Sequence, residues 1–162
     1  RPKIADYPFT TLHPNLGVVA IDGKEFVMAD IPGLIEGAHE GAGLGHRFLG
    51  HVERCRILLH LIDATGEDPV AAWKMLRNEL KAYGGDLYEK PEIVGLTKLD
   101  ATPEDYAADL AIALQEAGAG QVLALSSVTG SGVTTMLRQL INVIETSRAK
   151  EAEPEEAVPW SP

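Results

Sequence analysis

The sequence predicts an α/β domain with a mostly parallel sheet and one antiparallel hairpin. Short runs rich in β-branched and other apolar residues alternate with longer amphipathic stretches, which is typical of strands joined by helical crossovers. An Asp-Gly pair at Asp22–Gly23 stands between the first two runs, and this pair favours a tight hairpin. The chain has 162 residues, of which 45% are apolar, which is enough for one domain with its own core.

The expected strands are short runs bounded by turn residues. They are Leu16–Ile21, Glu25–Ile31, Ile57–Ile62, Glu92–Leu96 and Gln121–Leu125. The first two should pair antiparallel because only a short Asp-Gly turn joins them. The later strands should lie parallel because each is separated from the next by a stretch long enough for a helical crossover.

The stretches between and after the later strands carry apolar residues at helical spacing. The expected helices are Gly45–Arg54, Pro69–Tyr83, Pro103–Ala117 and Ser131–Ser147. Their apolar positions are expected to pack in the core rather than to bind a cofactor, and the main ones are Trp73, Leu76, Met136, Leu137, Leu140 and Ile144.

The composition excludes several classes of protein. Asp and Glu number 24 against 14 Lys and Arg, and the formal charge of −10 argues against broad nucleic-acid binding through this segment. The apolar runs are far shorter than the ~20 residues that cross a bilayer, so no membrane span is expected. Cys55 has no partner for an internal disulfide and no secretory signal follows Arg1, which together favour a cytoplasmic location.

We expect two parts in the chain. Residues 1–147 should form the folded domain, and residues 148–162 should form an acidic tail. From Glu151 onward the tail holds four Glu and three Pro without a basic residue. Such a segment buries too little apolar surface to offset the entropy lost on ordering, so it is expected to be disordered.

A carboxylate and a glycine follow the second expected strand, in Asp30-Ile31-Pro32-Gly33. In a nucleotide-binding protein, a carboxylate at such a strand end can hold Mg²⁺ through a water, and the glycine backbone can approach a phosphate. The same four residues also suit an ordinary turn. Upstream, Thr11 in the loop Tyr7–Thr11 can offer its hydroxyl to Mg²⁺.

A guanine-recognition pattern follows a later strand, in Thr97-Lys98-Leu99-Asp100. The two oxygens of a carboxylate can accept both hydrogens on the N1 and N2 edge of guanine, a donor pair that adenine lacks. The lysine stem can cover the base and sugar. The alternative is that Asp100 caps the helix beginning near Pro103. Ser126–Val128, in the loop after the last strand, offers backbone N–H groups to the base carbonyl.

The joint order of these motifs resembles the Obg family of GTPases, also called CgtA. The resemblance is carried by Asp6–Leu12, Pro14–Gly17, Asp30–Ala38, Gly41–Leu49 and His51, and it covers roughly residues 1–145. It implies a three-layer Ras-like fold of the P-loop GTPase class. It also implies binding of GTP and GDP with Mg²⁺, slow hydrolysis of GTP and assistance in assembly of the large ribosomal subunit.

The resemblance also assigns residues. Thr11 and Asp30 are expected at the metal, Gly33 at the γ-phosphate, and Asp100 and Lys98 at the guanine. The full expected nucleotide site is Phe9, Thr10, Thr11, Leu12, His13, Asp30, Ile31, Pro32, Gly33, Thr97, Lys98, Leu99, Asp100, Ser126, Ser127 and Val128. No side chain is assigned to the chemical step. The family suggests ppGpp as a further ligand, with ribosome contacts mainly outside this acidic segment.

The sequence departs from the family pattern in three places. It contains no Gly-x-x-x-x-Gly-Lys-Ser/Thr phosphate loop, which is expected before Arg1 together with its strand and helix. That strand would lie between Glu25–Ile31 and Ile57–Ile62, and the segment alone is expected to be inactive. Leu34 replaces the water-orienting glutamine of Ras-type enzymes, which predicts slow turnover or help from K⁺ or a partner. Thr97 replaces a more common Asn, so an amide contact to the base is lost.

A second interpretation stays open. The chain can be a non-catalytic interaction module that uses a nucleotide-binding fold as a scaffold, and both the missing loop and Leu34 are compatible with it. The sequence before Arg1 separates the two interpretations. A phosphate loop ending roughly 15 to 25 residues upstream would support the enzyme.

Overall fold

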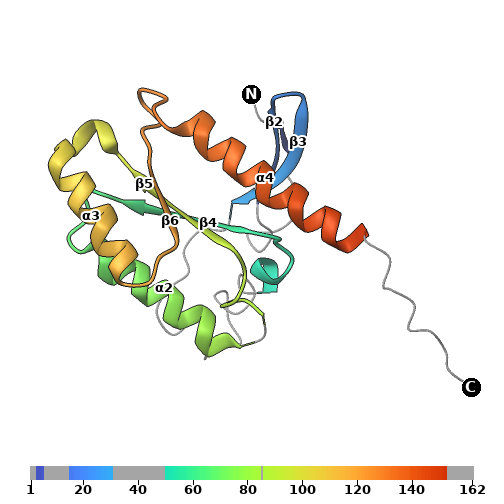
Figure 1. The fold of residues 1–162 in the computed structure, drawn as a ribbon, viewed down its shortest axis with the longest axis horizontal. Coiled ribbons are helices and arrows are strands. Elements are labelled where there is room, and N and C mark those ends of the chain that lie inside the picture. The colour runs from blue at the N-terminus through green and yellow to red at the C-terminus, as the bar shows by residue number, and fades with distance from the viewer. Residues whose placement is uncertain (1–2, 6–14, 31–49, 85, 153–162) are drawn as a thin grey trace, which may run out of the picture.

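The computed structural model describes residues 3–5, 15–30, 50–84 and 86–152. Within them lie two three-stranded sheets, ordered β1-β2-β3 and β4-β5-β6, and the helices α2, α3 and α4 (Figure 1). Helices α2 and α3 cover one face of the second sheet and α4 covers the other, which makes a three-layer α/β fold as expected (Figure 1).

The first sheet is an antiparallel hairpin with one added strand. Strands β2 (Asn15–Ile21) and β3 (Lys24–Asp30) pair antiparallel from Asn15↔Asp30 to Ile21↔Lys24. The turn residues Asp22 and Gly23 have φ of 50° and 75°, the two positive values that a type I′ hairpin turn requires. The hairpin prediction is confirmed. Strand β1 (Lys3–Ala5), which pairs antiparallel with β2, was not expected.

The second sheet is parallel, also as expected. Strands β4 (Leu58–Asp63), β5 (Glu92–Thr97) and β6 (Gln121–Ala124) pair in that order. Ile57 and Leu125, which were expected in strands, lie just outside β4 and β6. Among the described residues no strand pairs β3 with β4, so each sheet keeps one unpaired edge there.

The helices follow the expected spacing. Helix α2 (Pro69–Tyr83) has the predicted bounds, and its N-terminus is capped by the Asp68 carboxylate, which accepts from Ala71 N at 3.0 Å. Helix α3 spans Glu104–Glu116. Residues 50–53, part of the expected Gly45–Arg54 helix, are helical.

The last helix is longer than the sequence indicated. Helix α4 (Val133–Ala152) continues past Ser147, so residues 148–152 of the expected tail are helical. The Arg56 guanidinium donates to Ser147 Oγ at 3.3 Å and to Glu151 Oε1 at 2.6 Å, and these contacts support the added turn. Residues 153–162 lie outside the described part of the chain.

Apolar packing on the two faces of the parallel sheet fixes the layers. Alternate residues of β5 point to opposite faces, with Val94 packed toward α2 and α3 and Ile93 packed toward α4. The expected core residues of α2 and α4 are buried or packed against buried clusters, as predicted: Trp73, Leu76, Met136, Leu137, Leu140 and Ile144. No described helix is long and apolar enough to cross a membrane.

A buried polar cluster ties α2 to the amino ends of the strands. The Glu92 carboxylate accepts from Trp73 Nε1 at 2.8 Å and from Arg77 Nη1 at 3.2 Å. His60 Nδ1 lies 3.8 Å from Glu92 Oε2. Burial raises the pKa of Glu92, but the nearby His60 imidazole, the hydrogen bond from Trp73 and the charge of Arg77 together outweigh burial and leave this pKa below its ordinary value.

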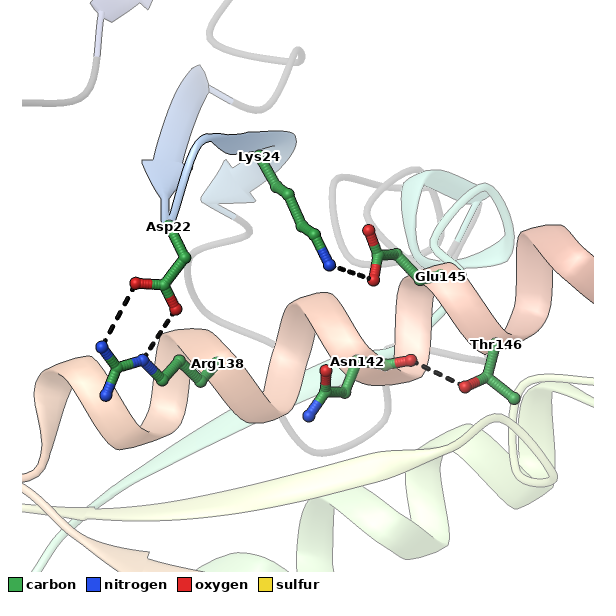
Figure 2. Close-up of polar contacts among 6 residues, drawn as sticks. All are labelled: Asp22, Lys24, Arg138, Asn142, Glu145 and Thr146. Carbon is green, nitrogen blue, oxygen red and sulfur yellow. Dashed lines mark hydrogen bonds and ion pairs between the residues drawn. The ribbon is translucent and has the colours of Figure 1, made fainter.

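Two exposed ion pairs tie the hairpin turn to α4 (Figure 2). The Arg138 guanidinium donates to both oxygens of Asp22, from Nε at 2.8 Å and from Nη2 at 3.2 Å. The Lys24 ammonium lies 2.8 Å from Glu145 Oε2. Both acceptor–donor pairs lie on one side of α4 and so align the hairpin along this helix.

We predict that Glu92→Gln lowers stability at neutral pH and weakens its pH dependence. The unfolded chain has an ordinary pKa of 4.5 for this group and the folded chain a lower one, so the carboxylate stabilises the fold above 4.5 and this contribution is lost as the pH falls through the folded value. The loss of a charged acceptor from Arg77 should cost about 1–3 kcal/mol. Melting curves of the full-length protein between about pH 7 and 3 measure both effects.

The control is Glu116→Gln, which removes an exposed carboxylate at the end of α3. It should leave the melting curves close to those of the parent protein. A Glu92→Gln variant that loses stability with acid as steeply as the parent would show that the buried cluster is not the source of the pH dependence.

Candidate functional site

The carboxyl ends of the parallel strands bring together residues from three loops. Because parallel strands run in one direction, Asp63 at the end of β4, Thr97 at the end of β5 and the loop after β6 meet at the same edge of the sheet. This edge is where open α/β sheets bind their ligands. The expected base-binding residues Thr97–Asp100 and Ser126–Val128 lie here.

The loop after β5 has a defined backbone conformation and is tied to the neighbouring strands by hydrogen bonds. Lys98 adopts the left-handed conformation, with φ 61° and ψ 37°, and Leu99–Ala101 form a short 3₁₀ turn. Leu99 N donates to Leu125 O at 3.1 Å, and the Thr97 hydroxyl donates to Ile62 O at 3.2 Å. Thr97, where an Asn is more common, thus ties its loop to β4.

The Asp100 carboxylate is oriented by a buried serine. Ser126 Oγ donates to Asp100 Oδ1 at 2.7 Å and accepts from Thr129 N at 3.2 Å. Ser126 is 1% exposed, whereas Asp100 is exposed. Helix α3 begins at Glu104, its N-cap residue is Pro103, and no side chain caps it, so the alternative that Asp100 caps this helix is wrong. The carboxylate is fixed from the protein side and open on the solvent side.

Gly132 closes the second loop and was missed from the sequence. Its φ is +76°, and a Cβ at this position would collide with the carbonyl oxygen of Ala124. Ser126 N donates to Ser131 O at 3.0 Å, and Gly130 N donates to Ser126 O at 2.8 Å. This tight loop leaves the predicted Val128 81% exposed and Ser127 exposed, where both are accessible to a ligand.

Asp63 is a second residue that the sequence analysis missed. Its Oδ2 lies 2.7 Å from Lys98 Nζ, and its Oδ1 accepts from Thr65 N at 2.9 Å and from Thr65 Oγ1 at 2.6 Å. The bond to Lys98 and then those from Thr65 lower the pKa of Asp63 to about 2. A carboxylate directly after the expected strand Ile57–Ile62 was the signal that could have identified it.

Of the remaining expected residues, the structure describes only Asp30. Asp30 ends β3, on the other sheet, and it is exposed. The expected residues Phe9, Thr10, Thr11, Leu12, His13, Ile31, Pro32 and Gly33 lie outside the described residues. Among the described residues, no group of three or more His, Cys, Asp or Glu side chains could hold a metal ion by itself.

A large cleft separates the two sheets. It has a volume of about 1170 Å³ and runs between the unpaired edges of β3 and β4. Phe26 and Met28 of β3, Leu59 of β4 and Leu140 of α4 are among its lining residues, and Asp30 lies at its margin. The cleft therefore presents apolar side chains together with two strand edges that no other described strand pairs.

Comparison with known proteins places these features in a family. A family model described as "50S ribosome-binding GTPase" matches residues 1–98. The chain is 57% identical to GTPase Obg of Zymomonas mobilis subsp. mobilis, over 100% of this chain and 47% of that protein. The chain thus spans about half the length of this curated relative.

Solved structures show the same fold at low identity. The cytosolic domain of the T. maritima FeoB iron transporter in a GDP form is 19% identical, with a TM-score of 0.63 over 87% of this chain and 52% of that one. Translation elongation factor SelB from Methanococcus maripaludis, in complex with a GTP analogue, is 17% identical, with a TM-score of 0.62 over 83% of this chain and 28% of that one. With a family match over residues 1–98 and 57% identity along its whole length, the chain belongs to the Obg family of ribosome-binding GTPases.

Proposed function

We propose that the chain is the guanine-nucleotide-binding part of a GTP-hydrolysing switch that assists assembly of the large ribosomal subunit. The observation that carries this proposal is the Asp100 carboxylate, which buried Ser126 orients at the carboxyl edge of the parallel sheet. Such a carboxylate can accept from both N1 and N2 of guanine. A fixed acceptor loses little entropy on binding, so it discriminates well between bases.

Asp30 is our candidate for the magnesium side of the site. Mg²⁺ keeps several of its waters when it is bound, so a single exposed carboxylate at a strand end can hold it through one of these waters. Thr11 is proposed as a direct ligand through its hydroxyl. When bound, Mg²⁺ would neutralise charge on the phosphates.

The phosphates need more donors than this sequence supplies. No Gly-x-x-x-x-Gly-Lys-Ser/Thr motif occurs in it, and the cleft between β3 and β4 has the free strand edges and apolar lining that an added strand would use. We place the strand that carries the phosphate loop in this cleft. Asp30 at the margin of the cleft would then lie next to the phosphates.

The remaining parts of the proposal concern rate, partners and location. Leu34 cannot orient a water, so intrinsic hydrolysis should be slow unless K⁺ or a partner supplies the contact. The formal charge of −10 places the main ribosome contacts outside this segment. The 50S-binding name of the family supports a ribosomal partner and a cytoplasmic site of action. ppGpp carries the same guanine edge as GDP and is proposed as a further ligand.

Base choice tests the role of Asp100. In Asp100→Asn one acceptor oxygen becomes a donor amide, which should favour xanthine because its C2 position carries a carbonyl oxygen. Competition between GDP and XDP for the full-length protein should shift by at least about tenfold toward XDP, the size of one charged hydrogen bond. An unchanged preference for GDP would remove Asp100 from base recognition.

Magnesium dependence tests Asp30. Asp30→Ala in the full-length protein should weaken Mg²⁺-dependent GTP binding, because a carboxylate on the metal side is lost. Thr11→Ala is the companion variant, which should weaken GTP binding and spare GDP. Titration of each nucleotide at several Mg²⁺ concentrations measures both effects, and the same magnesium dependence in parent and Asp30→Ala would contradict the assignment.

A longer chain that includes the upstream residues tests whether the strand that carries the phosphate loop lies in the cleft. The 162-residue chain alone should aggregate and show no thermal shift with Mg²⁺ and GDP, because apolar lining and two strand edges stay uncovered. The same chain extended through the upstream residues of its full-length protein should be monodisperse and gain a thermal shift. A short chain that melts cooperatively and binds GDP tightly would contradict the placement. An extended chain that folds but does not bind GDP would favour the interpretation as a non-catalytic interaction module.

A further inference from the structure

A lysine and a carboxylate from neighbouring strands meet beside the base-binding residues. Lys98 Nζ lies 2.7 Å from Asp63 Oδ2. Asp63 on β4 is the register partner of Thr97 on β5, and Lys98 comes directly after Thr97. The two charged residues therefore lie side by side at the end of the sheet. Both side chains remain accessible, with Lys98 58% exposed and Asp63 43% exposed.

Both partners of this ion pair are held by further contacts. Thr65 donates from its N and its Oγ1 to Asp63 Oδ1, so the carboxylate has a fixed orientation. Lys98 has a left-handed backbone, and its carbonyl oxygen accepts from the Thr102 hydroxyl at 2.8 Å. Most exposed ion pairs lose side-chain entropy when they form. Here the two contacts from Thr65 already restrict the Asp63 side chain, so part of that entropy is lost before the ion pair forms.

We propose that Asp63 is a positioning residue for the purine nucleotide, acting through Lys98. It holds the ammonium at the end of β4, so the aliphatic stem of Lys98 is in place to cover the base before the nucleotide arrives. The inference rests on the proposed function, because it assumes that a guanine nucleotide binds at Asp100. It adds a residue that the guanine-recognition pattern itself does not contain.

The arrangement also separates two tasks. Asp100 is oriented by Ser126 and Asp63 by Thr65, so each carboxylate has its own neutral hydroxyl partner. With its ammonium at Asp63, Lys98 leaves the Asp100 carboxylate to the donors of the base. Loss of Asp63 should therefore weaken binding of purine nucleotides in general, whereas loss of the Asp100 charge should change which purine is preferred.

The test is a double-mutant cycle in the full-length protein with GDP and XDP as probes. Asp63→Asn keeps an oxygen that accepts from Thr65 and removes only the charge. It should weaken GDP binding by about threefold, in the range measured for accessible ion pairs, without changing the ratio of GDP to XDP affinity. In a Lys98→Met background the same substitution should have no further effect, because its partner is gone.

Two controls separate positioning from general effects. Asp68→Asn removes a nearby carboxylate while keeping a side chain that caps α2, and it should bind GDP like the parent. High salt screens accessible ion pairs, so the difference between parent and Asp63→Asn should shrink in about 1 M KCl. Because its charge is stabilised in the fold but exposed, Asp63→Asn should lower the melting temperature without nucleotide only slightly.

The contrary outcomes are distinct. GDP binding by Asp63→Asn equal to that of the parent overturns the positioning role and leaves the proposed function intact. An equal loss of GDP binding with and without Lys98 shows a structural role for Asp63 and also overturns it. A parent protein that shows no preference for GDP over ADP overturns the proposed function and this inference together.

Discussion

The candidate site depends on the parallel pairing of β4, β5 and β6. Because the three strands run in the same direction, residues that lie far apart in the sequence leave the sheet at one edge. The contacts of Asp63 with Lys98 and of Ser126 with Asp100 depend on this arrangement. The central strand β5 is buried from Ile93 to Leu96, so apolar packing on both faces fixes the register on which these contacts depend.

The two ends of the parallel sheet use polar residues in opposite ways. At the amino end, Glu92 is 9% exposed and its oxygens are taken up by Trp73 and Arg77, so this cluster stabilises the fold. At the carboxyl end, Lys98 is 58% exposed and its partner Asp63 43%. Polar groups there are held by protein contacts on one side and are open to solvent on the other, as binding of a polar ligand requires.

Local chemistry explains which features the sequence predicted. The hairpin at Asp22–Gly23 and the bounds of α2 follow from a turn preference and from a capping residue, both readable in a few residues. Asp63 was missed because its role comes from a neighbour on another strand. The extension of α4 was missed for a similar reason, since its last turn is contacted by Arg56, a residue far away in the sequence.

Helix α4 is the described element that sets how Asp30 and Asp100 lie relative to each other. The two carboxylates belong to different sheets, and buried residues of α4 pack in one cluster with Phe26 of β3 and Ile93 of β5. The ion pairs at the hairpin turn contribute little because they are exposed, so this apolar cluster carries most of the attachment. A strand added in the cleft would pair with β3 and β4 directly. On our proposal, the strand that brings the phosphate loop therefore also fixes the distance between the metal carboxylate and the base carboxylate, so the parts of the nucleotide site form together.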